Sequence, residues 1–140
     1  MSEANKALVR RWFDEVWSKG RVAAIDELLA NHGVVHGLGA DAHGPEGFKI
    51  FHAAQRSAFP DITVQVDDIV AEGNMVAARW SGTGTHRGDG LGFAATGRQV
   101  RFNGMVFVRV ENGQLVEGWN VFDQLGMLQQ LGVVNPPAAV

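Results

Sequence analysis

The chain lacks cysteine, long apolar runs and clusters of basic residues. The absence of cysteine excludes disulfide bonds, thiolate nucleophiles and zinc–thiolate sites, and it fits a reducing compartment, so we expect a cytoplasmic protein. No apolar run approaches the roughly 20 residues of a membrane-spanning helix. Charges spread through the N-terminal segment distinguish it from a secretory signal. We therefore expect no membrane partner.

Basic residues are scattered, and 12 Lys and Arg against 15 Asp and Glu leave a formal net charge of -3. This pattern excludes a nucleic-acid partner. With 46% apolar and 19% charged residues in 140, the composition is that of a globular protein long enough to bury its own core. We expect one domain over residues 1–140, with a loose tail from about residue 133.

Apolar residues recur at helical spacing in the first 60 residues. A broad stripe predicts a helix that ends at Gly20, and a second helix is expected from Arg21 to about residues 31–33. A third helix begins at Gly44, with Pro45 at its first position, and ends before Pro60. One polar residue, Gln55, lies on the apolar stripe of this third helix.

From residue 62 the apolar period changes to two, which is typical of strands. Strands are expected over residues 34–36, 62–70, 75–85, 99–110 and 114–123, and a short helix over 125–131. Asn112-Gly113 is a hairpin signal, and the glycine-rich segment 86–96 is expected to be a flexible loop. Helices followed by strands indicate an α+β fold, with three N-terminal helices on one face of a mostly antiparallel sheet.

Strand alternation divides the sheet's side chains between two faces. Trp80, Val106 and Phe122 belong to the face expected to lie toward the helices, together with Val116, two residues before Gly118. We expect this face and the third helix to line a pocket for a small apolar organic ligand; the alternative is an interior that the same side chains fill. The aromatic lining is expected from Phe48, Phe51, Phe59, Trp80 and Phe122.

The opposite sheet face combines charged residues with four large apolar ones, Met105, Phe107, Trp119 and Val121. Such a patch usually marks an interface. We expect it to pack against a second copy of the chain as a homodimer. The alternative is that the C-terminal segment covers it.

Four segments together resemble the SnoaL-like polyketide cyclases of the nuclear transport factor 2-like superfamily: NKALVRRWFDEVW, GPEGFKIFHAAQRSAFPD, VAARWSGTGTHRG and VRFNGMVFVRVENGQLVEGWNVFDQLGMLQQLG. The resemblance implies a cone-shaped α+β barrel with a strongly curved sheet, a pocket inside the cone and a dimer through the outer sheet face. It also implies intramolecular aldol chemistry with no cofactor and no metal. In the family, an Asp on the last strand acts as acid and base beside a polar residue on the adjacent strand.

This sequence departs from that family pattern at both positions, which hold Asn120 and Val106. The resemblance therefore leaves two functions open: a cyclase-type enzyme doing cofactor-free proton transfer on an apolar carbonyl compound, and a non-catalytic protein that binds a small apolar ligand. A purely structural dimer module is a third possibility. The fold does not decide between them.

Two residues are candidates for catalysis in the enzyme hypothesis. His36, on the early strand, is a general base if it points into the cone, because histidine titrates near pH 6.5; the alternative is a histidine held by a backbone carbonyl. Asn120 is a candidate donor to an enolate oxygen, the alternative being a structural amide. His86 is expected at the pocket mouth or exposed beside the loop, and His52 at the helix surface or rim. No H-E-x-x-H pattern or convergent histidine set indicates a metal site.

Overall fold

The computed structural model describes residues 2–135. The three predicted helical regions are present: α1 (Ser2–Arg11) continues directly into the π-helix η1 (Trp12–Ser18), α2 (Val22–Leu28) follows, and α3 (Gly44–Ala58) comes after the first two strands. The second helix is shorter than expected. It ends at Leu28 because Leu29 already pairs with Leu115 in the sheet, so strand pairing replaces the predicted last helical turn.

Six strands form one open sheet in the order β2-β1-β6-β5-β4-β3. Their bounds are β1 (Leu29–His36), β2 (Ala42–His43), β3 (Thr63–Glu72), β4 (Met75–Thr85), β5 (Gln99–Glu111) and β6 (Gln114–Phe122). All neighbouring pairs are antiparallel except β1 with β6, which confirms the mostly antiparallel expectation. Asn112 and Gly113 have φ values of 52° and 72° at the β5–β6 turn, as an Asn-Gly hairpin requires.

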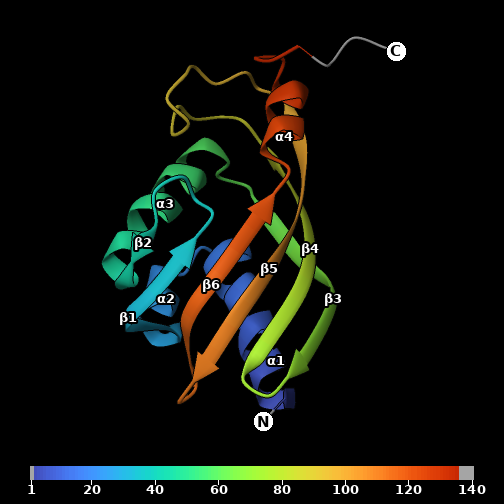
Figure 1. The fold of residues 1–140 in the computed structure, drawn as a ribbon. Coiled ribbons are helices and arrows are strands. Elements are labelled where there is room, and N and C mark those ends of the chain that lie inside the picture. The colour runs from blue at the N-terminus through green and yellow to red at the C-terminus, as the bar shows by residue number, and fades with distance from the viewer. Residues whose placement is uncertain (1, 136–140) are drawn as a thin grey trace.

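The helices α1, α2 and α3 cover one face of the curved sheet, while among residues 2–135 no helix covers the opposite face of β4, β5 and β6 (Figure 1). The short α4 (Gln124–Leu131) lies at the far end of the sheet and buries Met127 and Leu131. Asp123 begins α4 as its N-cap, since its carboxylate accepts a hydrogen bond of 2.8 Å from the Gly126 amide. Within residues 2–135, no helix has the length and apolarity to cross a membrane.

A β-bulge shifts the side-chain alternation at the start of β6. Arg109 pairs with Glu117 and Val110 with Leu115, so Val116 is an extra residue in β6. For that reason Leu115, and not Val116, lines the interior beside β6, which corrects the predicted alternation there. From Gly118 to Phe122 the alternation follows the sequence prediction.

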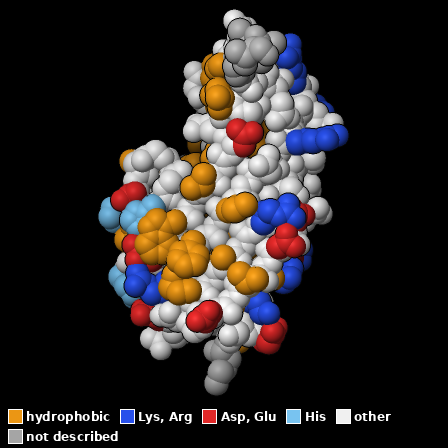
Figure 2. Space-filling view, turned by 45° about the vertical axis from the view of Figure 1, so that its right-hand side comes forward, with side chains coloured by type: hydrophobic (Ala, Val, Ile, Leu, Met, Phe, Trp, Pro, Cys, Tyr) orange, Lys and Arg blue, Asp and Glu red, His pale blue; other side chains and the backbone are white. Residues whose placement is uncertain are grey.

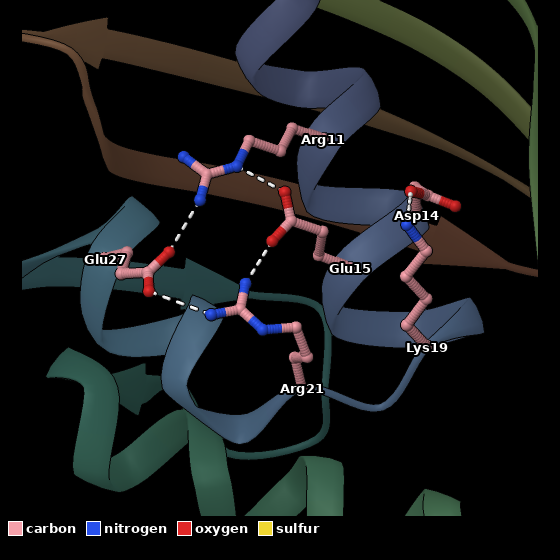
Figure 3. Close-up of polar contacts among 6 residues, drawn as sticks. All are labelled: Arg11, Asp14, Glu15, Lys19, Arg21 and Glu27. Carbon is pink, nitrogen blue, oxygen red and sulfur yellow. Dashed lines mark hydrogen bonds and ion pairs between the residues drawn. The ribbon is translucent and has the colours of Figure 1, made fainter.

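Four charged side chains tie the N-terminal helix to α2 (Figure 3). Arg11 and Arg21 both bind the Glu15 carboxylate, and both also bind Glu27, at 2.6 Å from Arg11 and 3.0 Å from Arg21. The hydrogen bond from Arg11 is the main reason that the pKa of Glu15 lies below its ordinary value. This network fixes η1 next to α2 on the solvent side while the opposite side of η1 faces the sheet.

Candidate functional site

A cavity of about 90 Å³ lies between the concave sheet face and the helices. The sheet contributes Trp80, Phe102, Val106, Val108, Leu115, Gly118, Asn120 and Phe122, and the helical segments contribute Val9, Trp12, Phe13, Trp17, Phe48, Phe51 and Gln55. Five residues that the sequence assigned to the pocket therefore line this cavity together with Asn120: Phe48, Phe51, Trp80, Val106 and Phe122.

The cavity has a closed apolar end and a more open end. The closed end is formed by residues such as Val9, Leu29 and Val108, each at most 4% exposed. The partly exposed lining side chains are Val35, Leu38, Phe51, Gln55, Asn120 and Phe122, and also Trp17, Val64 and Val106. Two of these residues, Gln55 and Asn120, carry amide groups.

The π-helix η1 explains how one short segment supplies three aromatic wall residues, Trp12, Phe13 and Trp17. In a π-helix the N–H of residue i+5 donates to the carbonyl of residue i, and the wider turn brings residues five apart onto the same face of the helix. Trp12 and Trp17 are five apart, and the π geometry turns both toward the cavity, where an α-helix would separate them. Sequence periodicity places these residues in the core but gives no sign of the π-helix.

The wall holds few polar groups, and none of its side chains titrates between pH 2 and pH 12. The clearest polar groups are the amides of Asn120 and Gln55 and the Trp80 indole. Within residues 2–135, the buried Trp80 Nε1 has no hydrogen-bond partner. An unsatisfied buried donor costs roughly 1–3 kcal/mol. Sequence reasoning missed Gln55 as a wall residue, although a polar residue on an apolar helical stripe was the available signal.

Gly104 sets the position of the Trp80 indole. Trp80 pairs with Gly104, which in turn pairs with Phe122. A Cβ at residue 104 would lie 2.8 Å from Trp80 Cε2 and 2.8 Å from Phe122 Cβ, so the indole occupies the space left by the missing side chain. The Trp80 ring therefore lies next to Gly104 of β5, with its centroid 5.9 Å from that of Phe13 and 6.4 Å from that of Phe122.

His36 does not point into the cone, and the prediction that it faces the cavity is wrong. Its partner in the sheet is Trp119, on the outer face, and the two rings stack with centroids 5.4 Å apart. His36 Nε2 lies 2.7 Å from Glu117 Oε2, and Nδ1 lies 3.1 Å from Asp41 Oδ1. The preceding residue, Val35, points inward instead. Both ring nitrogens of His36 face carboxylates, so the alternative prediction, a histidine bonded to a backbone carbonyl, is not observed either.

His86 and Phe59 are core residues beyond the cavity wall. Both are 0% exposed, so His86 lies neither at the mouth nor at an exposed loop edge. His86 Nδ1 accepts a hydrogen bond of 3.1 Å from the Thr96 amide, and the ring packs against Phe59 and Phe93. The glycine-rich loop folds over these side chains, which explains their burial.

His52 is also buried, at 3% exposure, and not at the helix surface. Its Nε2–H donates to the Val16 carbonyl at 2.7 Å, which joins α3 to η1 behind the cavity wall. Burial is the main cause that lowers the pKa of His52 below its ordinary value; the hydrogen bond to Val16 opposes this shift and nearby Arg56 adds to it. Among residues 2–135, no group of three His, Asp or Glu side chains is arranged to hold a metal ion.

The chain belongs to the SnoaL-like polyketide cyclase family, whose model matches residues 7–131. This finding confirms the resemblance inferred from the four sequence segments. No curated protein matches the chain significantly.

Solved structures with the same cone fold include three at 25–32% identity. IdmH, a candidate polyketide cyclase from Streptomyces antibioticus, is 32% identical with a TM-score of 0.80, over 91% of this chain and 98% of IdmH. A candidate SnoaL-like polyketide cyclase from Jannaschia sp. CCS1 is 25% identical with a TM-score of 0.85, over 97% and 95% of the two chains. AclR, a candidate hydroxylase from Streptomyces galilaeus, is 26% identical with a TM-score of 0.83, over 97% and 85%.

Proposed function

We propose that this protein binds a compact, uncharged, mostly apolar molecule in the cone and that its cavity wall carries out no acid–base chemistry. The observation that supports this proposal is the composition of the wall. Apolar and aromatic side chains make up nearly all of it, and its polar groups are amides and indoles. An amide does not accept a proton near pH 7, and His36 lies on the other face of the sheet.

The size of the cavity limits the part of the ligand that enters it. An engineered apolar cavity of about 150 Å³ holds benzene, whereas this cavity measures about 90 Å³. A small ring or a short branched chain fits the closed end. The rest of a larger ligand extends through the mouth between Gln55 and Asn120, so the two amides are placed to contact it there.

Binding is tested by thermal unfolding with small cyclic ketones and hydrocarbons at millimolar concentration. A ligand that binds only the folded state raises the melting temperature as its concentration rises. Val106→Phe fills the cavity from the sheet side and should abolish the rise, while Val70→Phe, the same substitution at a 67% exposed strand position, should retain it. An equal rise in both variants would place binding outside the cone and refute the proposal.

A cyclase-type enzyme is the second candidate, because the family model covers nearly the whole chain. In this function a solvent hydroxide takes the proton from the carbon between two carbonyls of a polyketone and becomes water, and the Asn120 amide donates a hydrogen bond to the resulting enolate oxygen. Asn120→Ala should then slow ring closure, and Asn120→Asp should accelerate it by supplying the missing base. His36→Ala should leave the rate unchanged, since His36 faces away from the cavity. Ring closure of a linear 1,3-diketone, followed by absorbance, measures all three.

We also propose that the outer sheet face is the interface of a homodimer. Met105, Phe107, Trp119 and Val121 are between 37% and 72% exposed, and Figure 2 shows hydrophobic side chains gathered in this region of the surface. Four large apolar groups on one strand pair form a patch of the kind that protein partners cover. Sedimentation equilibrium should give a dimer for the native chain and a monomer for Phe107→Lys. A monomeric native chain at micromolar concentration would refute this part of the proposal.

A further inference from the structure

We propose that His36 makes the association of two chains through the outer sheet face pH-dependent. The homodimer strengthens as the pH falls from about 8 to about 6, the range in which histidine takes up its proton. This inference rests on the homodimer proposed above and adds the group that regulates it. The juxtaposition that carries it is one imidazole between two carboxylates at the edge of the exposed apolar patch.

His36 belongs to the surface that a second copy would cover. Its ring stacks on Trp119, and the Trp119 ring centroid lies 6.1 Å from that of Phe107. The three rings form one row across β1, β6 and β5, and Figure 2 shows histidine side chains directly beside the hydrophobic group on this face. The His36 side chain is 27% exposed, so a partner that packs on Trp119 removes water from His36 as well.

The hydrogen-bond geometry around the imidazole changes with its protonation. Nε2 lies 2.7 Å from Glu117 Oε2, and Nδ1 lies 3.1 Å from Asp41 Oδ1. A neutral imidazole has one N–H, so it donates to only one of these carboxylates and turns a lone pair toward the other. The protonated ring donates to both. Proton uptake by His36 therefore replaces a repulsive N···O contact with a hydrogen bond.

The charges around His36 set the direction of the pH dependence. Glu117 on β6 and Asp41 between β1 and β2 are negative, and Arg109 on β5 binds the second oxygen of the Glu117 carboxylate. The group has one net negative charge when the ring is neutral and none when the ring is protonated. Within residues 2–135, no other charged side chain makes an ion pair with it, and His43 on the neighbouring strand β2 is exposed.

Dimer formation removes water from this group. A net charge loses more free energy on losing its water than a fully paired neutral group does. The dimer therefore holds more protons than two separate chains, and mass action favours the dimer as the pH falls. Each copy supplies one His36, so a dimer takes up at most two protons and its dissociation constant changes by at most about 100-fold per pH unit.

The test measures the dimer dissociation constant by sedimentation velocity at about pH 6 and about pH 8, at constant ionic strength, with circular dichroism as the check that each variant is folded. The native dimer should dissociate at least about tenfold more weakly at the lower pH. In His36→Gln, whose amide takes up no proton in this range, the two constants should agree within about twofold. His43→Gln, the same substitution at the exposed histidine of β2, should keep the native dependence.

A second variant tests the charge argument without a change at His36. Asp41→Asn removes one carboxylate, so the group is neutral while the ring is neutral. At about pH 8 this variant should dimerise as tightly as the native chain does at about pH 6, an effect that a merely steric role of His36 would not produce.

Three results would each overturn the inference: a native dimer whose dissociation constant does not change with pH, a native-like pH dependence in His36→Gln, or an Asp41→Asn dimer no tighter than the native one at the higher pH. In all three the homodimer itself stands. A native chain that is monomeric at both pH values at micromolar concentration refutes the proposed homodimer and the inference with it.

Discussion

Two glycines on the concave sheet face allow a matched test of the cavity. A Cβ added at Gly118 would meet only Val108 Cγ2 at 3.9 Å, an ordinary contact, because the residue borders empty space. A Cβ added at Gly104 would lie 2.6 Å from the Val121 carbonyl oxygen and 2.8 Å from Trp80 Cε2. The same substitution, glycine to alanine, should therefore have opposite effects at the two positions.

Gly118→Ala should stabilise the protein. Removing glycine's freedom in the unfolded chain contributes about 0.4–1 kcal/mol, and burying one methyl group contributes about 0.8 kcal/mol. The sum, about 1–2 kcal/mol, corresponds to a rise in melting temperature of about 4–6 °C for a chain of this length. The added methyl group also occupies part of the cavity, so the affinity for cyclopentanone should fall at least about fivefold.

Gly104→Ala should destabilise the protein by roughly 1–3 kcal/mol, since the backbone carbonyl of Val121 cannot move without breaking the β5–β6 pairing. Differential scanning calorimetry and NMR titration of both variants provide the measurements. A loss of stability in Gly118→Ala as large as that in Gly104→Ala would show that the space beside Gly118 is filled. Unchanged affinity in a stable Gly118→Ala would show that the ligand does not occupy this cavity.

Three further predictions concern stability. Burial lowers the pKa of His52, so the unfolded state binds more protons than the folded state once the pH falls below about 6.5. The free energy of unfolding should therefore decrease below that pH, by at most about 1.4 kcal/mol per pH unit. Urea unfolding between pH 7.5 and pH 5 should show this loss, and His52→Gln should lack its His52 component. Glu15→Gln should lower the melting temperature at pH 7, and the drop should be larger in low salt than in high salt. The difference in melting temperature from the native chain should shrink as the pH falls through the lowered pKa of Glu15. Equal drops at both salt concentrations would argue against the ion-pair network. Asp123→Ala should cost about 1 kcal/mol through the lost N-cap of α4, and a change below 0.3 kcal/mol in urea unfolding would contradict that role.

The sequence predicts most of the architecture because its local signals agree with the tertiary structure. Period-two alternation locates β4 between residues 75 and 85, as observed, and Gly44-Pro45 marks the start of α3. Two local predictions fail where a distant segment decides the outcome. Leu29 is not helical because it pairs with Leu115, and Val116 does not face the cavity because it is the extra residue of a β-bulge opposite β5. In both cases the deciding contact is with another strand, which the local sequence around Leu29 or Val116 does not reveal.

The candidate site was less predictable because side-chain direction depends on register. His36 and Val35 are neighbours, and a shift of one residue in the parallel pairing with β6 exchanges which of them faces the cavity. His86 shows a different difficulty: the segment after it reads as a flexible loop, yet Thr96 folds back to bond the ring. Burial by a loop has no periodic signal in sequence.

The chain has the fold of its family, but the residues that line its cavity include no titratable side chain. Asn120 pairs with Val106 across β5 and β6, so neither of these two adjacent inner-face positions carries a side chain that can take up a proton near pH 7. The histidine nearest to β6 is held by Glu117 and stacked on Trp119 outside the cone. The aromatic wall is nevertheless complete, from η1 through α3 to β4 and β6. A cavity lined by aromatic and aliphatic side chains, with no titratable group among its lining residues, supports the proposal that it binds an apolar molecule without acid–base chemistry.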